Sequence, residues 1–187
     1  MKNTLMSVVA FSAVASAAWG GERMASDAVT VKEDSIVLPT YAPGGYDKTP
    51  LFYTGRVYQG AQGRVYPYPM QDVLFDGKAD ETYKYLTLEN RWLQMGLLPE
   101  HGGHLLNLTD KETGFETFYR QHVVKPALIG MLGAWISGGV EWNFPHHHRA
   151  TTAMPIDWKL AANADGSKTV WIGETELRRR LKWTIGL

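Results

Sequence analysis

Short runs rich in Val, Ile, Thr and Tyr, interrupted at short intervals by glycine and proline, are the feature that most restricts how this chain can fold. The alternation within these runs is typical of β-strands, and no segment shows a long helical period. The sequence therefore predicts an all-β, mainly antiparallel fold. The predicted strands occupy residues 29–38, 51–58, 63–68, 83–89, 92–98, 104–109, 115–119, 156–161, 168–174 and 175–185.

The last predicted strand, residues 175–185, contains an unusual arginine. Side chains of a strand alternate between its faces, which places Arg179 on the apolar side and Glu176 on the solvated side. A guanidinium on an apolar face needs a carboxylate or a ligand to offset its desolvation. Arg179 is therefore expected either to pair with a residue such as Glu174 or to face a ligand.

Two further expectations concern the carboxyl-terminal region. Alternation places Trp171 and Trp183 in the core and leaves Glu174 and Glu176 solvated. The chain ends at residues 185–187, inside a predicted strand, and a strand end normally needs a partner for its backbone groups. We therefore expect the sequence to be the amino-terminal part of a longer protein.

Charge and cysteine content exclude several classes of function. The 187 residues carry 19 Lys and Arg against 19 Asp and Glu, so the formal charge is zero. Binding to nucleic acid or to an anionic membrane surface needs a basic excess, so neither is expected. Cysteine is absent, which excludes a thiol nucleophile, a thiolate zinc site, an iron–sulfur cluster and a disulfide scaffold.

The first 20 residues have the layout of a secretory signal. Lys2 precedes an apolar run at residues 5–15, and the small residues Ala15-Ser16-Ala17 supply a cleavage site. The mature protein then begins near Ala18 and acts in the periplasm or outside a bacterial cell. No later segment could span a membrane, because residues 127–140 are apolar but short and rich in glycine. We expect one mature domain over residues 21–187.

The segment of residues 135–149 holds the densest set of chemically useful side chains. Read as a strand, it places Glu141 and Asn143 on the face opposite Val140 and Trp142, and three histidines follow at once. Gly138-Gly139 allows positive φ and a close approach of the backbone, so the segment can enter from a tight turn. This pattern makes it the leading site candidate.

Sugar recognition could use these groups, since it needs planar hydrogen-bonding side chains for the hydroxyls and an aromatic face for the apolar side of the ring. Acid–base chemistry on a sugar needs a carboxylate paired with a second titratable group. The predicted catalytic residues are Glu141, His147 and His148. The predicted substrate-binding residues are Trp135, Trp142, Asn143, Arg149, Arg179 and His104.

Two alternatives remain open at this point. A metal-assisted hydrolase could be built around His146 and His148, because adjacent histidines of an extended chain point to opposite faces and only these two could converge. Such a site would need further ligands from elsewhere in the chain. The other alternative is a noncatalytic β-domain, in which the histidines line a polar loop and the domain packs on a downstream module. No cofactor is expected.

Two stretches of the sequence resemble known families. Residues 88–119, with a Pro-Glu-His-Gly-Gly turn between two strands and an Asp-Lys-Glu-Thr-Gly turn after them, resemble the opening of galactose mutarotase-like domains. Residues 135–149, with Asp165-Gly-Ser-Lys-Thr-Val-Trp171 and the later arginine-rich strand, resemble a bacterial subgroup, the domain of unknown function 5107, which tetratricopeptide repeats often follow.

The resemblance implies an antiparallel β-supersandwich that binds carbohydrate in the concave face of one sheet. Aldose epimerases of this superfamily use a glutamate base and a histidine acid, and their glutamate lies late in the chain, so it is not carried over to a residue here. The resemblance therefore predicts an exported carbohydrate-binding or carbohydrate-processing domain, epimerase-like or glycosidase-like if it is an enzyme. A downstream tetratricopeptide repeat module is a possible partner.

Overall fold

The computed structural model describes residues 28–43, 57–58, 61–62, 66–69, 74–128, 134–145 and 148–187. The predicted signal segment and most of the predicted strands at 51–58 and 63–68 lie outside this range. No helix within the described ranges is long and apolar enough to cross a membrane. The strands are β1 (Thr30–Pro43), β2 (Val57–Tyr58), β3 (Ala61–Gln62), β4 (Leu74–Glu89), β5 (Leu93–Leu98), β6 (His104–Asp110), β7 (Ala127–Leu128), β8 (Ala134–Trp135), β9 (Asp157–Ala162), β10 (Lys168–Glu176) and β11 (Leu181–Gly186).

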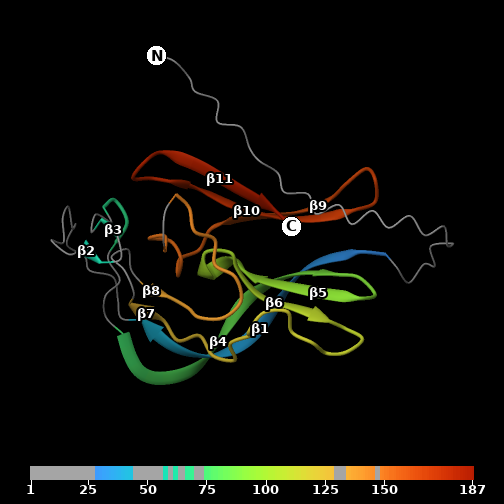
Figure 1. Cartoon of the computed structure of the whole chain (residues 1–187), viewed down its shortest axis with the longest axis horizontal. Coiled ribbons are helices and arrows are strands. Elements are labelled where there is room, and N and C mark those ends of the chain that lie inside the picture. Colours follow the sequence, from blue (N-terminus) through green and yellow to red (C-terminus); the bar gives the residue numbers. More distant parts are fainter. Residues whose placement is uncertain are drawn as a thin grey trace, which may run out of the picture.

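Two antiparallel sheets form the two layers of the molecule (Figure 1). The larger sheet has the strand order β1-β4-β5-β6, and the smaller one has the order β11-β10-β9. The short strands β2 and β3 pair with each other, as do β7 and β8. This arrangement confirms the predicted all-β antiparallel fold, with a sandwich-like packing of the two sheets.

The β4–β5 hairpin shows why the local sequence predicted its strands well. The Asn90 side chain Oδ1 accepts hydrogen bonds from the backbone N–H groups of Trp92 and Leu93, both at 2.8 Å. A short polar side chain that bonds its own following backbone favours a turn. Cross-strand pairs such as Leu86–Leu97 then place apolar side chains on one face, so the hairpin is confirmed.

The main core lies between the two sheets. Side chains on the inner face of the larger sheet pack against Ile156 and side chains of β10 and β11. Burial of this apolar surface is the dominant favourable contribution to folding. The buried members are Leu86, Leu97, Leu105, Ile156, Val170, Ile172 and Trp183.

A second core lies on the opposite face of the larger sheet, where Val124 and Ile136 cover Leu98 and Leu106. A register shift between Gly96 and Leu97 accompanies it in the pairing of β5 with β6. Because residues on both faces of this sheet are buried, its strands contain apolar residues on both sides. The cover on the second face comes from the segment between β6 and β9, which also carries the candidate site.

The predicted strand at residues 175–185 is wrong in its middle. Residues 177–180 form a turn between β10 and β11, and Arg180 adopts φ 55° there. The turn ends the alternation, so Arg179 is exposed and is not on an apolar face. Glu176, expected to be solvated, is only 2% exposed, and Trp171, expected in the core, is 42% exposed. Trp183 lies in the core as predicted.

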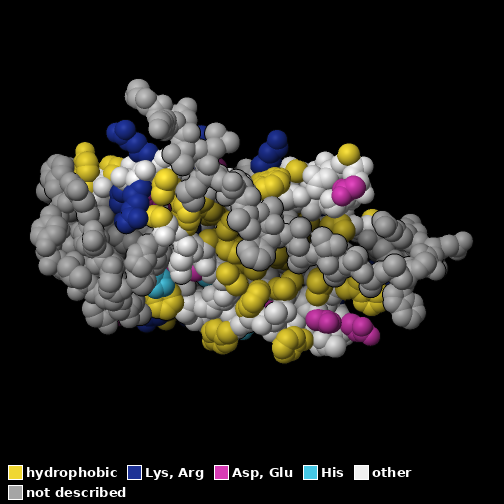
Figure 2. Space-filling model, turned by 45° about the horizontal axis from the view of Figure 1, so that its top comes forward, with side chains coloured by type: hydrophobic (Ala, Val, Ile, Leu, Met, Phe, Trp, Pro, Cys, Tyr) yellow, Lys and Arg dark blue, Asp and Glu magenta, His cyan; other side chains and the backbone are white. Residues whose placement is uncertain are grey.

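The described surface mixes charge types. In the view of Figure 2, hydrophobic side chains gather toward the middle, whereas basic and acidic side chains lie toward the rim. Exposed large hydrophobic residues of the described chain include Phe115, Tyr119 and Leu177. The view shows no continuous stripe of one charge sign, in agreement with the balanced composition.

Candidate functional site

The segment that carries the candidate site is fixed to β6 by a close backbone approach. Val140 forms an antiparallel bridge with Leu105, through hydrogen bonds of 2.9 and 3.0 Å. Gly138 and Gly139 adopt φ 82° and 57°, as the sequence predicted for this pair. A Cβ atom on Gly139 would lie only 2.0 Å from the Leu105 carbonyl oxygen. Glycine is therefore required there for the segment to reach the sheet.

The predicted strand over this segment is reduced to the short β8 and the single bridge at Val140, because residues 141–145 follow an irregular path. Val140, Trp142 and Phe144 nevertheless all pack against the main core. The expected apolar face therefore exists without regular strand pairing. The Glu141 carboxylate instead contacts His148 and Thr152, which follow it in the sequence.

Glu141 and His148 form the central contact of the site. The His148 ring Nδ1 lies 2.8 Å and 3.0 Å from the two carboxylate oxygens of Glu141. The His148 ring also stacks on the Trp135 indole, with ring centroids 5.2 Å apart and planes 26° apart. The structure thus brings together three of the residues that the sequence singled out, and it holds the imidazole in one orientation.

Trp142 and Asn143 take different positions from those residues. The Trp142 indole Nε1 donates a hydrogen bond of 2.8 Å to the backbone oxygen of Gly103, and the ring packs against the main core. These contacts tie the indole to the core, and its role as a platform for a sugar stays a prediction. Asn143 is exposed and follows Trp142 on the irregular segment.

Arg149 is buried in the interior and does not face solvent. Its side chain is 1% exposed, and its Nη1 donates a hydrogen bond of 2.8 Å to Glu174 Oε1. Its Nη2 donates to the Gly102 carbonyl at 2.7 Å, and the guanidinium lies 4.4 Å from the centroid of the Trp183 ring. Burial lowers the pKa of Arg149, although the nearby carboxylates of Glu174 and Glu141 oppose this.

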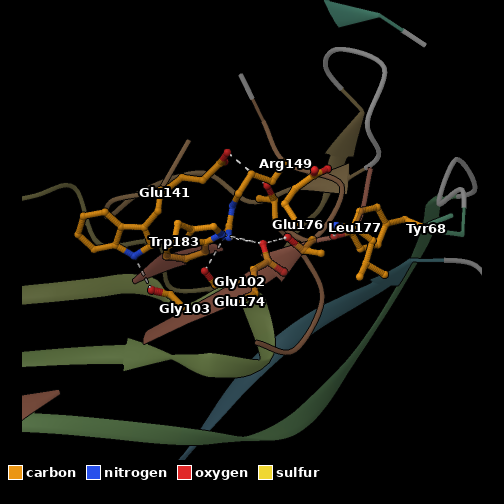
Figure 3. A network of polar contacts seen from close by, with 12 residues as sticks. Tyr68, Gly102, Gly103, Glu141, Arg149, Glu174, Glu176, Leu177 and Trp183 are labelled. Carbon is orange, nitrogen blue, oxygen red and sulfur yellow. Dashed lines mark hydrogen bonds and ion pairs between the residues drawn. The ribbon is translucent and has the colours of Figure 1, made fainter. Parts of the chain in front are cut away.

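This geometry corrects the predicted substrate contact of Arg149, because Glu174 and Gly102 already use both terminal nitrogens. Figure 3 shows the Arg149 side chain between Glu141 and Glu174. Glu174 was expected on a solvated face. Instead it shares the inner face of β10 with Val170 and Ile172, four and two residues before it, and this shared face was the signal that could have revealed its burial.

His104 begins β6 as predicted, and its side chain is buried. It is 2% exposed, and neither of its ring nitrogens makes a well-formed hydrogen bond within the described part of the chain. Burial lowers the pKa of His104 to about 4, a change that the Gly138 backbone partly opposes. Burial, with a smaller effect of His104, also lowers the pKa of His101 to about 4.

The remaining predicted residues fall outside this cluster. His146 and His147 lie outside the described residues. Arg179 lies in the β10–β11 turn, where its backbone N–H donates a hydrogen bond of 2.8 Å to Glu176 Oε2. No three His, Asp or Glu side chains converge as a metal-ligand set in the ranges that the structure describes.

Comparison with solved structures supports the fold. The chain resembles the crystal structure of a TPR-domain-containing protein from Parabacteroides distasonis ATCC 8503, with a TM-score of 0.70 and 24% sequence identity. The match covers 84% of this chain and 26% of the other, so the present chain spans about a quarter of that protein's length. At this level of identity the likeness establishes the fold.

Comparison with family models agrees with the family resemblance seen in residues 135–149. Residues 61–187 match the model of a domain of unknown function, DUF5107. This match covers more than half of the chain, including both sheets' central strands and the segment with Glu141 and His148. The chain therefore belongs to the DUF5107 family.

Proposed function

We propose that this domain binds a carbohydrate beside the Glu141–His148 pair. The observation that carries the proposal is the contact of His148 Nδ1 with both oxygens of Glu141, at 2.8 and 3.0 Å, on a ring stacked against Trp135. Sugar hydroxyls both donate and accept hydrogen bonds, so a carboxylate and an imidazole held side by side form a suitable recognition pair.

His148 is oriented for contact with a ligand. An ionised carboxylate only accepts, so Glu141 selects the form of His148 that carries a proton on Nδ1. Nε2 then faces away from Glu141 and has no hydrogen-bond partner within the described chain. The His148 side chain is 28% exposed, so solvent reaches the ring. Trp135 acts as a positioning residue, since one face of its indole already contacts His148.

The same pair could transfer a proton if the domain is an enzyme. His148 Nε2 would exchange a proton with a sugar hydroxyl or ring oxygen, while Glu141 stabilises the ring when it is positively charged. This chemistry is that of an epimerase-like or glycosidase-like enzyme, in keeping with the resemblance to galactose mutarotase-like domains. The two-sheet antiparallel architecture supports that relationship. His147, next to His148 in the sequence, remains a candidate partner.

The domain's setting is part of the proposal. The amino-terminal sequence supports export to the periplasm or beyond, by the order of Lys2, the apolar run and the Ala-Ser-Ala site. The similar solved protein is a TPR-domain-containing protein, which supports a tetratricopeptide repeat module as a neighbour of this domain in a longer protein. In that arrangement the β-domain would bind the sugar and the repeats would bind another protein.

Calorimetry on the Glu141→Gln variant tests the proposal. With mono- and oligosaccharides that bind the unchanged chain, we expect at least a tenfold loss of affinity, because the amide cannot hold the imidazole as a carboxylate does. Glu112→Gln is the matched control, since Glu112 is exposed in a turn. Unchanged affinity of the Glu141→Gln variant would remove this pair from the site.

A chelator distinguishes the metal-dependent alternative. Carbohydrate binding that continues in the presence of chelator supports the proposal. Loss of binding and stability together on chelation would instead favour a metal site around His146 and His148.

A further inference from the structure

A pocket lies beside the segment that follows Arg149, where Thr151 and Met154 form part of its lining. It has a volume of about 480 Å³ and is lined by residues that include Tyr68, Thr151, Met154, Ile156, Glu174 and Leu177. The pocket opens where β10 meets the β10–β11 turn. Its volume is within the range of small-molecule sites. None of the residues in the Glu141–His148–Trp135 cluster lines it.

Glu174 offers this pocket one unused acceptor. All three hydrogen bonds of its side chain end on the same oxygen, Oε1, and come from Arg149 Nη1 at 2.8 Å, Thr151 Oγ1 at 2.6 Å and Trp183 Nε1 at 3.1 Å. The other oxygen, Oε2, has no partner within the described chain. Since three donors fix the carboxylate, Oε2 is held in place for a fourth.

Tyr68 offers the pocket one unused donor. Its hydroxyl oxygen accepts a hydrogen bond of 2.7 Å from the backbone N–H of Leu177, as Figure 3 shows. The hydroxyl proton has no acceptor among the residues described. Burial raises the pKa of Tyr68, so the hydroxyl keeps its proton at neutral pH. The phenol is therefore held in position by the backbone while its proton remains available.

The charge and shape of the pocket restrict the class of ligand. Among the described residues, its lining includes a second carboxylate, Asp157, and no Lys, Arg or His, so an anion is disfavoured. The charge of Glu174 is already balanced by Arg149, so a strong demand for a cation is absent as well. Met154, Pro155 and Ile156 supply an apolar wall beside the polar groups. An apolar wall with one fixed donor and one fixed acceptor matches a neutral polyol.

We propose that this pocket is a second carbohydrate subsite, in which one ligand hydroxyl donates to Glu174 Oε2 and accepts from the Tyr68 hydroxyl. The subsite shares the ligand class of the proposed function but none of its residues. Thr151 contacts Glu174 and Thr152 contacts Glu141, so consecutive residues of one segment connect the two sites.

Nuclear magnetic resonance of the full chain, with labelled methionine methyl groups and tryptophan indoles, tests the two sites separately. The Met154 methyl reports the pocket, and the Trp135 indole reports the Glu141–His148 site. The probes are D-glucose, D-galactose and their disaccharides, with choline as a cationic probe and inorganic phosphate as an anionic one. We expect a sugar to shift the Met154 signal in a saturable way, and we expect choline and phosphate to leave it unchanged.

Tyr68→Phe is the decisive variant, because it removes the hydroxyl and keeps the ring. Leu177 is exposed, so water can replace the bond to its N–H, and the fold is expected to persist, as thermal unfolding will verify. Affinity read at Met154 should fall at least tenfold. Tyr119→Phe, which alters a tyrosine that is 71% exposed, is the control and should change nothing.

Opposing results separate the two proposals. A Met154 shift that is lost in Tyr68→Phe and retained in Glu141→Gln supports the subsite. Sugar shifts at Trp135 alone, an unchanged affinity in Tyr68→Phe, or a response to choline or phosphate without one to sugar would overturn the subsite. A shift at Met154 without one at Trp135 would overturn the proposed function and leave the subsite standing.

Discussion

Glu141 and Glu174 are two carboxylates on either side of one short segment, and they are held in opposite ways. Glu141 meets His148, whose side chain is 28% exposed. Glu174 meets Arg149, which is 1% exposed and whose charge is permanent. The first pair includes an imidazole ring that solvent can reach. The second is an internal ion pair that fixes the segment joining the two sites.

Of the substitutions that test this difference, replacement of the buried Arg149 should change the free energy of unfolding most. Arg149→Met should lower the free energy of unfolding by about 3–5 kcal/mol, because it leaves Glu174 as an uncompensated charge in the interior. Urea denaturation measures the change. Arg179→Met, which alters an exposed arginine of the turn, should stay within about 0.5 kcal/mol of the unchanged chain. A loss of less than about 1 kcal/mol in Arg149→Met would show that the pair contributes little.

The loss of stability at acidic pH is expected to come from the two buried histidines and not from the Glu141 and Glu174 pairs. The folded-state pKa of His101 and His104 is about 4, below the ordinary value of 6.5, so the unfolded chain binds protons first as the pH falls. Their contribution is complete above about pH 6.5 and is lost toward pH 4, by roughly 3 kcal/mol for each histidine. Urea titrations at pH 7, 5.5 and 4.5 measure the loss.

Substitutions can show which residues cause this loss of stability at low pH. His104→Leu should reduce the loss of stability on acidification, whereas His122→Gln, at an exposed histidine, should not. Glu141→Gln should retain the full loss. If the loss instead disappeared in Glu141→Gln, the Glu141–His148 pair would be the main acid-sensitive element and the contrast drawn above would be wrong.

The smallest expected difference is between two neighbouring threonines, one bonded to each carboxylate. Thr151 Oγ1 donates to Glu174 at 2.6 Å, whereas Thr152 Oγ1 donates to Glu141 at 3.4 Å. Thr151→Val should lower the free energy of unfolding by about 1.5–3 kcal/mol, because it removes a short bond to a charged group in the interior. Thr152→Val should cost less than about 1 kcal/mol. Equal losses in thermal or urea unfolding would show that the two carboxylates are equally constrained.

Local patterns predicted the regular strands but not the partners of buried charges, and residues 115–119, expected as a strand, form only a single bridge at Glu116. The alternation in residues 83–98 and the side chain of Asn90 predicted the β4–β5 hairpin, because both signals act within a few residues. The period of two failed at residues 177–180, since it holds only while a strand stays regular. The single turn there reversed the expected exposure of Glu176.

In the candidate site, too, contacts between residues close in the sequence were predictable and contacts between distant residues were not. Gly138-Gly139, Glu141 and His148 are close in the sequence, so their association required only that the segment turn back on itself. Arg149 points into the interior because Glu174, 25 residues away, lies on the inner face of β10. A contact of that kind depends on how the two sheets pack, which no local pattern contains.

The contact of Gly139 with Leu105 also limits how the length of this segment can change. The backbone at Gly139 lies directly against the Leu105 carbonyl of β6, and this contact fixes the position of Glu141 relative to the sheet. An insertion within residues 138–141 would therefore break the contact between the segment and β6. A longer segment is therefore expected to separate Glu141 from His148 and to disrupt the contact on which the proposed site depends.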